Sequence, residues 1–348
     1  MNVSDSIGVV GAGSWGTTLA QVLAEKGYQV DLWVYEQDLC EIIAGKRENA
    51  FYLPGFPLHE NILPHNDLQQ VVADHALLVM VVPSHVYRNV ASQMLPFLSQ
   101  NTIIVSATKG IENETLLTMS GIWQELLPAS GFARIASLGG PTFAREVIQK
   151  MPTAITVAAD DLDLAKTLQR VFSTAFFRVY TSLDKTGLEL AGALKNVIAL
   201  AAGASDGLGF GFNTRAALIT RGLAEISRLG VKMGAHPLTF SGLSGIGDLV
   251  LTCTGDLSRN RTVGMQLGQG RTLEEILGEM RMVAEGVKTA RSVHFLAQKK
   301  EVDMPISEQV YQVLFENKNP LLAVRELMDR DLKHELEVSW EMMRDACQ

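Results

Sequence analysis

The run SIGVVGAGSWG, residues 6–16, places the pattern G-x-G-x-x-G directly after a short apolar segment. Residues 17–26 are typical of a helix that ends at Gly27, so the glycines lie between a predicted strand and a predicted helix. In that context Gly11 allows a sharp turn, Gly13 lets the backbone approach a pyrophosphate, and Gly16 lets helix and strand pack closely. The free N–H groups at the helix start face the phosphates. The run therefore predicts a nicotinamide-dinucleotide site.

An acidic residue follows the second predicted strand, residues 29–34. Glu36 lies about 20 residues beyond Gly16, where a carboxylate can bind an adenosine ribose. Such a carboxylate repels a 2′-phosphate and accepts a hydrogen bond from a 2′-hydroxyl, which favours NADH. NADPH stays possible if the Glu36 side chain swings away. An ordinary glycine-rich turn is the weaker interpretation, because strand, helix and acidic residue all stand where the fingerprint needs them.

Composition restricts the class of protein. With 348 residues, 47% of them hydrophobic and 20% charged, the chain is expected to form two globular domains. The net charge of −8, without a block of like charge, disfavours nucleic acid as a partner. Cys40, Cys253 and Cys347 are too widely spaced for a disulfide framework, so we expect a reducing cytoplasm. Because the first predicted strand begins within a few residues of the start, we expect no signal peptide, and no uninterrupted apolar run reaches the ~18 residues of a membrane span.

Residues 1–183 alternate strand and helix patterns. After the first βαβ unit, strands are expected at residues 76–82, 102–105, 133–138, 153–158 and 177–180. This alternation predicts an α/β dinucleotide-binding domain with a Rossmann-type, doubly wound, mostly parallel sheet, whose ligands bind at the carboxyl ends of the strands. Small, polar and basic residues follow those ends: Ser14, Ser84, Lys109, Gly140 and Thr142. Each alone could be a helix cap or a solvated loop lysine, but together they favour a shared crevice.

Residues 184–348 lack strand patterns and are predicted to form an all-α substrate-binding domain, packed closely on the first because no flexible linker separates them. Its first helix, about 183–202, has an apolar stripe on one side and Lys195 on the other. Lys195 interrupts small and apolar residues, so we expect it to be partly buried rather than solvated.

Two segments receive no firm role from the sequence. Residues 49–57 could form a surface loop or a flap over a ligand. The C-terminal tail, residues 334–348, is given no catalytic role.

Two further stretches of the second domain lead into predicted helices. The glycine-rich residues 241–247 precede Asp248, which could simply cap its helix. Residues 258–261, Ser-Arg-Asn-Arg, offer a hydroxyl, an amide, guanidinium donors and free backbone N–H groups, a combination that suits an anion. Ser258 could cap the helix and still bind a phosphate. The seven histidines are scattered, without an H-E-x-x-H pair or a Cys/His cluster, so no metal site is expected.

In combination these motifs resemble the bacterial NAD(P)-dependent sn-glycerol-3-phosphate dehydrogenases. The shared segments follow the family's order to about residue 333, at residues 11–16, 82–84, 106–110, 140–144, 194–197, 245–249, 258–260, 285–287 and 304–306. The resemblance implies reduction of dihydroxyacetone phosphate to sn-glycerol 3-phosphate with NADH or NADPH, which supplies phospholipid synthesis. It implies Lys195 as the catalytic proton carrier. We expect a cytoplasmic homodimer that does not insert into membranes.

The resemblance also implies contacts position by position. The residues expected to bind substrate are Lys109, Gly140, Thr142, Lys195, Asp248, Ser258, Arg259 and Asn260. Beyond the glycines and Glu36, those expected to bind the cofactor are Ser14, Trp15, Tyr35, Lys109, Ala144, Arg259, Val283 and Glu285. Relatives that prefer NADPH often carry a basic residue or histidine where this chain has Tyr35-Glu36. That departure leaves the cofactor preference open.

Two other functions compete with this interpretation. A β-hydroxyacid dehydrogenase or a ketopantoate reductase also pairs a Rossmann-type domain with a helical lysine, but its substrate is a carboxylate. The segment 258–260 argues for a phosphate instead. A non-catalytic NAD(H) sensor is a remote alternative, because Lys195, Asp248 and the anion-binding segment would then share no purpose.

Overall fold

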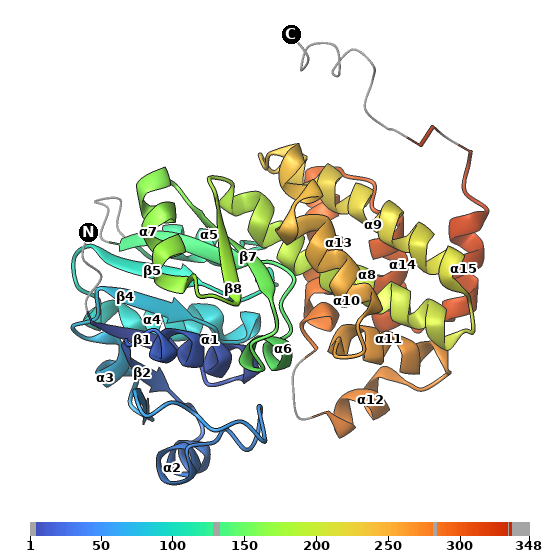
Figure 1. Ribbon diagram of the computed structural model, residues 1–348. Helices are drawn as coiled ribbons and strands as arrows, with labels where there is room; N and C mark the ends of the chain where they lie inside the picture. Colours follow the sequence, from blue (N-terminus) through green and yellow to red (C-terminus); the bar gives the residue numbers. More distant parts are fainter. Residues whose placement is uncertain (1–4, 128–132, 281–283, 333, 336–348) are drawn as a thin grey trace.

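The computed structural model describes residues 5–127, 133–280, 284–332 and 334–335. An eight-stranded sheet forms the N-terminal part, and helices form the C-terminal part beside it (Figure 1). The strand order is β3-β2-β1-β4-β5-β6-β7-β8, and all neighbours are parallel except β6 and β7. The predicted fold class, a doubly wound α/β sheet followed by an all-α region, is confirmed.

The sheet part is built from short strands joined by helices. Its strands are β1 (Ser6–Val10), β2 (Gln29–Trp33), β3 (Ile62–His65), β4 (Leu77–Met80), β5 (Thr102–Ser106), β6 (Ala133–Gly139), β7 (Thr153–Ala159) and β8 (Phe177–Ser182). Its α-helices are α1 (Ser14–Glu25), α2 (Gln37–Lys46), α3 (Leu68–Val72), α4 (Tyr87–Met94), α5 (Met119–Leu126), α6 (Ala144–Ile148) and α7 (Leu162–Phe172). Short 3₁₀ turns at Ser84–Val86 and Leu95–Phe97 flank α4.

The structure differs from the sequence-based expectation at two strands. Strand β3 was not expected, since it is short and contains Pro64, which an edge strand tolerates because its outer N–H groups need no partner. Strand β7 runs antiparallel to β6, so β7 and β8 point opposite to the other strands. Helix α5 begins at Met119, because Leu116 takes a positive φ of 62° and Thr118 caps the helix.

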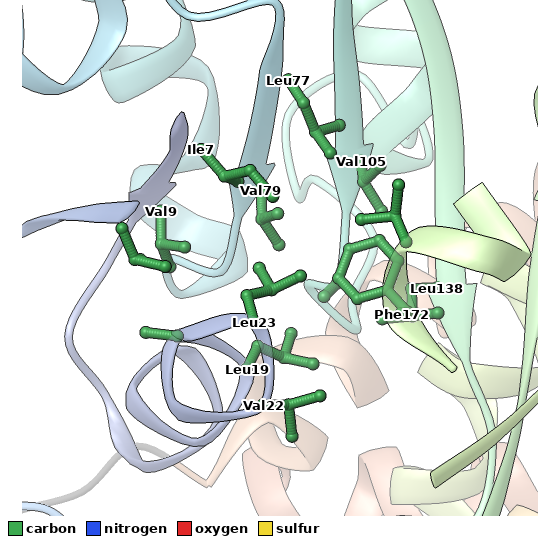
Figure 2. Close-up of a cluster of buried hydrophobic side chains, with 14 of the residues drawn as sticks. Ile7, Val9, Leu19, Val22, Leu23, Leu77, Val79, Val105, Leu138 and Phe172 are labelled. Carbon is green, nitrogen blue, oxygen red and sulfur yellow. The ribbon is translucent and has the colours of Figure 1, made fainter. Parts of the chain in front are cut away.

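The two faces of the sheet carry separate apolar cores. On one face Ile7 and Val9 of β1 meet Leu19 and Leu23 of α1, as Figure 2 shows, and Phe172 of α7 joins the same cluster. The opposite face packs against α3, α4 and α5. Each fully buried side chain of this size contributes about 1.5–3 kcal/mol. Helices therefore cover both faces of the sheet. The loops that follow the parallel strands lie at their carboxyl ends, which is where a ligand can reach the sheet.

The C-terminal part is organised around one long helix. Its α-helices are α8 (Lys185–Gly207), α9 (Phe212–Lys232), α10 (Asp248–Thr254), α11 (Arg259–Gly268), α12 (Leu273–Glu279), α13 (Glu285–Lys300), α14 (Pro305–Phe315) and α15 (Pro320–Met328). A 3₁₀ turn (Pro237–Ser241) and a π turn (Leu243–Gly247) precede α10. By length and composition alone, α8 could cross a membrane, the one such helix among the described residues. However, 89% of its apolar window is buried inside the protein, and core helices of soluble proteins pass the same test.

Helices α8 and α11 cross at very short distance because glycines face each other. A Cβ atom on Gly203 would lie 2.0 Å from the carbonyl oxygen of Arg261, and one on Gly207 would lie 2.1 Å from that of Met265. From the other side, a Cβ on Gly264 would lie 2.1 Å from the carbonyl oxygen of Leu200. No larger residue fits without a shift of the backbone. This crossing fixes the start of α11, and with it residues 258–260, relative to the lysine on α8.

Candidate active site

The glycine turn between β1 and α1 has the geometry that the sequence predicts. Gly11 takes a φ of 117°, and a Cβ on Gly16 would lie 1.9 Å from the Gly11 carbonyl oxygen. A Cβ on Gly13 would meet nothing within 4 Å, and Gly13 starts α1 without a side-chain cap. There is thus free space beside the start of α1, where the first N–H groups of a helix lack intrahelical partners. Turn and helix start fit the pyrophosphate of a dinucleotide, which would bind at these amides.

Ser14 and Trp15, the first residues of α1, follow this turn directly. The Trp15 indole Nε1 is buried and has no hydrogen-bond partner among the described residues. Ala144 begins α6, and its carbonyl accepts a 3.3 Å hydrogen bond from Thr18 of α1, so it also lies beside the turn. These three expected cofactor contacts are therefore brought together by α1. An unsatisfied donor at this position is consistent with a ligand that would complete it.

The end of β2 carries the two residues expected at the adenosine ribose. Tyr35 is 75% exposed, and its ring packs edge-on against Trp33. Glu36 is half-buried, and its Oε1 accepts a 2.6 Å hydrogen bond from the Tyr52 hydroxyl. Because β1 and β2 are parallel neighbours, Glu36 emerges beside the glycine turn. Loop 49–57, which the sequence left as a surface loop or a flap, therefore contacts the expected ribose-binding residue.

Lys195 lies on α8 with only 6% of its surface exposed, as its place in an apolar stretch predicts. Its Nζ donates to Asp248 Oδ1 and to Thr252 Oγ1, both at 2.6 Å. The other oxygen of Asp248, Oδ2, accepts a 2.8 Å hydrogen bond from Lys109 Nζ. Asp248 is 1% exposed and does not cap α10, because Gly247 holds the cap position. One buried carboxylate thus joins a lysine of the helices to a lysine of the sheet edge.

The surroundings of Lys195 shift its pKa. Burial lowers the pKa of Lys195 from 10.5 to about 8, because the charged ammonium loses its hydration. The Asp248 carboxylate opposes this by raising the same pKa, and the positive charge of Lys109 lowers it further. The net direction, which sequence alone could not give, is downward. A pKa near neutral pH is what an acid–base group requires.

The loop after β6 supplies the next expected substrate contacts. Gly140 takes a φ of 153°, and its carbonyl accepts a 3.2 Å hydrogen bond from Lys109 Nζ. The Thr142 hydroxyl donates to the same carbonyl at 3.3 Å. Lys109 therefore bridges Gly140 and Asp248. The residues that sequence placed at separate strand ends, Lys109, Gly140 and Thr142, do form one group.

The start of α11 carries the expected phosphate-binding segment. Ser258 is 3% exposed and caps the helix, since its Oγ accepts from the Arg261 backbone N–H at 3.3 Å. Asn260 donates to Asn196 Oδ1 at 2.9 Å and accepts from the Gly286 N–H at 2.9 Å, which leaves one amide hydrogen for a ligand. The Arg259 guanidinium makes no hydrogen bond among the described residues, although the charge of Glu285 acts on it. Arg261, in contrast, is paired with Asp206 and Asp256.

Glu285 links the helical part to the sheet edge. Its carboxylate accepts from the Ser84 hydroxyl at 2.5 Å and from the Ser84 N–H at 3.3 Å. Burial raises the pKa of Glu285, whereas the hydrogen bonds from Ser84 lower it. Glu285 thus lies at the same edge as Lys109, as its expected cofactor contact requires. Val283, the other expected contact from this segment, lies outside the described residues.

Sequence reasoning missed Thr252, Tyr52 and Asn49. Thr252 follows Asp248 by four residues on α10, so both face Lys195, and that spacing was a readable signal. Tyr52 and Asn49 lie in an irregular loop with no motif. Among the described residues, no group of three or more His, Cys, Asp or Glu side chains could hold a metal ion.

Models of known protein families match both parts of the chain. Two family models, for the N-terminus and the C-terminus of NAD-dependent glycerol-3-phosphate dehydrogenase, match residues 6–165 and 184–325. The chain belongs to the NAD-dependent glycerol-3-phosphate dehydrogenase family. The segments that carried the sequence resemblance all lie within these two matched ranges.

Individual relatives cover nearly the whole of this chain. It is 67% identical over 338 residues to "Glycerol-3-phosphate dehydrogenase [NAD(P)+]" of Syntrophobacter fumaroxidans. The aligned region covers 97% of this chain and 99% of the relative. A protein of the same name from Citrifermentans bemidjiense is 59% identical over 333 residues, 96% of this chain and 99% of its own. The crystal structure of the glycerol-3-phosphate dehydrogenase of Coxiella burnetii superposes with a TM-score of 0.89 at 40% identity, and covers 93% of this chain and 99% of that one.

Proposed function

We propose that this chain reduces dihydroxyacetone phosphate to sn-glycerol 3-phosphate with NADH or NADPH, reversibly, and so supplies glycerol phosphate for phospholipids. The observation that carries the proposal is the Asp248 carboxylate shared by Lys195 and Lys109. It connects a buried proton carrier to the sheet edge where the glycine turn would hold a dinucleotide. Family membership and relatives of matching length support the same reaction.

Lys195 is the proposed proton donor. An ammonium has three N–H donors, and Asp248 and Thr252 occupy two of them. The third is then left for the substrate carbonyl oxygen, which it polarises and finally protonates. When bound, NADH or NADPH supplies the hydride for the carbonyl carbon. Lys109 and Asp248 hold the Lys195 side chain in place throughout.

The substrate phosphate is proposed to bind at the start of α11. Ser258, Arg259 and Asn260 present a hydroxyl, an unpaired guanidinium and an amide beside the first backbone N–H groups of this helix. Binding energy from this non-reacting group would orient the carbonyl toward Lys195. Arg259→Ala is expected to raise KM for dihydroxyacetone phosphate by about 10- to 100-fold, because a charged hydrogen bond to the phosphate is lost. A change confined to cofactor affinity would place the phosphate elsewhere.

A spectrophotometric assay tests the reaction directly. Purified protein is mixed with dihydroxyacetone phosphate and either NADH or NADPH, and cofactor oxidation is followed. Turnover is expected with this substrate and not with 2-keto acids or ketopantoate. 3-Hydroxy acids are assayed in the oxidative direction, with NAD+ or NADP+, and no cofactor reduction is expected. Turnover of a carboxylate substrate alone would favour the β-hydroxyacid dehydrogenase or ketopantoate reductase alternative. Stoichiometric cofactor binding without turnover of any substrate would favour a sensor.

The proposal includes the organisation of the chain. A dinucleotide-binding domain of residues 1–183 and a helical substrate domain of residues 184–348 are supported by the end of β8 at Ser182 and the start of α8 at Lys185. We propose a cytoplasmic homodimer that takes a small phosphate substrate and neither inserts into membranes nor binds nucleic acid. Buried free Cys40 and Cys253 fit a reducing compartment. Light scattering of the purified protein tests the dimer.

A further inference from the structure

Loop 49–57 contacts the expected ribose-binding carboxylate through a single side chain. The Tyr52 hydroxyl donates a 2.6 Å hydrogen bond to Glu36 Oε1 across 16 residues of sequence. The other oxygen, Glu36 Oε2, has no donor within the part of the chain that the structure describes. A carboxylate held at one oxygen keeps the lone pairs of the other available to a ligand.

The tyrosine is itself fixed to the glycine turn. Its backbone N–H donates to Asn49 Oδ1 at 3.0 Å. Asn49 is fully buried, and its Nδ2 donates to the Ala12 carbonyl and to Thr17 Oγ1, both at 2.8 Å. Ala12 lies inside the glycine turn. One chain of hydrogen bonds therefore runs from that turn through Asn49 and Tyr52 to Glu36, so the turn and the carboxylate keep a set relative position.

The ring of Tyr52 also has packing partners. It packs against the apolar core on the α1 face of the sheet and lies edge-on to Phe51. Burial, followed by the negative charge of Glu36, raises the pKa of Tyr52 to about 12. The hydroxyl therefore remains a protonated donor at any pH in which the protein works. Removal of this donor alone would free the Glu36 side chain to rotate.

We propose that Tyr52 is a positioning residue that fixes the Glu36 carboxylate and thereby sets the preference for NADH over NADPH. This inference rests on the proposed dehydrogenase function. A carboxylate that is fixed beside the ribose accepts a hydrogen bond from a 2′-hydroxyl. The same fixed charge repels a 2′-phosphate, because it cannot turn away. The sequence left open whether Glu36 swings aside, and the Tyr52 hydrogen bond is what holds it.

Removal of the hydroxyl tests the proposal while the ring remains. The substitution Tyr52→Phe is expected to lower the NADH-to-NADPH preference, measured as the ratio of the two dissociation constants, by about threefold to tenfold. Both constants come from fluorescence titration of the reduced cofactors with the protein, without substrate. In turnover, the change should appear in KM for the cofactors rather than in kcat. Tyr28→Phe is the matched control, since Tyr28 packs against the same core and should leave the ratio unchanged.

A double-mutant cycle separates positioning from general damage. In a Glu36→Gln background, Tyr52→Phe should change the ratio by less than about twofold, because no charge remains to be positioned. Equal weakening of both cofactors, or the same ratio change with and without Glu36, would overturn the proposal. If wild-type protein binds cofactors but does not turn over dihydroxyacetone phosphate, the proposed reaction is wrong. The titrations still test whether Tyr52 sets the cofactor preference, because they need no substrate. Failure to bind either cofactor would refute both.

Discussion

The glycine turn and the Lys195 site are built in opposite ways. The turn consists of consecutive residues 11–16, and its function depends on backbone shape, with Gly11 at a φ of 117°. The Lys195 site joins three distant segments, since Asp248 lies 53 residues from Lys195 and 139 residues from Lys109. A local motif therefore specifies the turn at which we propose that a dinucleotide binds. Only the packing of α8, α10 and the sheet edge brings together the three residues of the proposed proton-transfer site.

The largest expected effect comes from Lys195→Met, which removes the ammonium but keeps an apolar chain of similar length. We expect kcat to fall by about 10³-fold, within the range for loss of a general acid. NADH affinity should stay within about twofold, because the glycine turn is intact. Steady-state kinetics and fluorescence titration measure the two quantities. Wild-type turnover in this variant would remove Lys195 from the mechanism.

A smaller effect is expected from Asp248→Asn, which keeps the shape of the side chain but removes its charge. We expect kcat/KM to fall about 100-fold, since both lysines lose their partner. In the wild type, reduction should decline as pH rises through about 8, where Lys195 loses its proton. Asp248 raises the pKa of Lys195, so its neutralisation should move this decline to lower pH. A pH profile of kcat/KM tests the sign.

The control for that profile is Asp163→Asn, the same chemical change at an exposed position on α7. Its pH profile should coincide with that of the wild type. A decline at unchanged or higher pH in Asp248→Asn would mean that Lys195 is not the titrating group. The Lys195 site could then no longer be contrasted with the glycine turn as a proton-transfer site assembled from distant segments.

The sequence predicts features that depend on nearby residues better than features that depend on distant segments. The glycine turn, the Ser258 cap and the buried position of Lys195 each depend on neighbours within a few residues, and the structure agrees with all three. The reversal of β7 depends on which strand it pairs with, and periodicity contains no such information. Strand β3 was missed because Pro64 and its four-residue length hide the pattern.

Within the site, residue types were more predictable than their partners. Asp248 could be singled out from its position before a helix, yet capping was an equally good interpretation until its two lysines were seen. The direction of the Lys195 pKa depends on burial in three dimensions, which outweighs the attraction of Asp248. Tyr52 lies in a loop without a motif, so only its distance to Glu36 gives it a role.

The smallest expected effects separate two glycines with different purposes. In Gly264→Ala the new methyl would lie 2.1 Å from the Leu200 carbonyl oxygen, so α8 and α11 must move apart. We expect the free energy of unfolding to fall by about 1–3 kcal/mol, the usual cost of overpacking, visible as a lower Tm. In Gly13→Ala the methyl meets no protein atom within 4 Å, so Tm should hold while NADH affinity weakens by about tenfold. The reverse pattern would be a Gly13 variant with a lower Tm and normal NADH affinity. It would show that Gly13 serves packing, because replacing a glycine whose only role is to contact a ligand leaves the stability of the ligand-free protein unchanged.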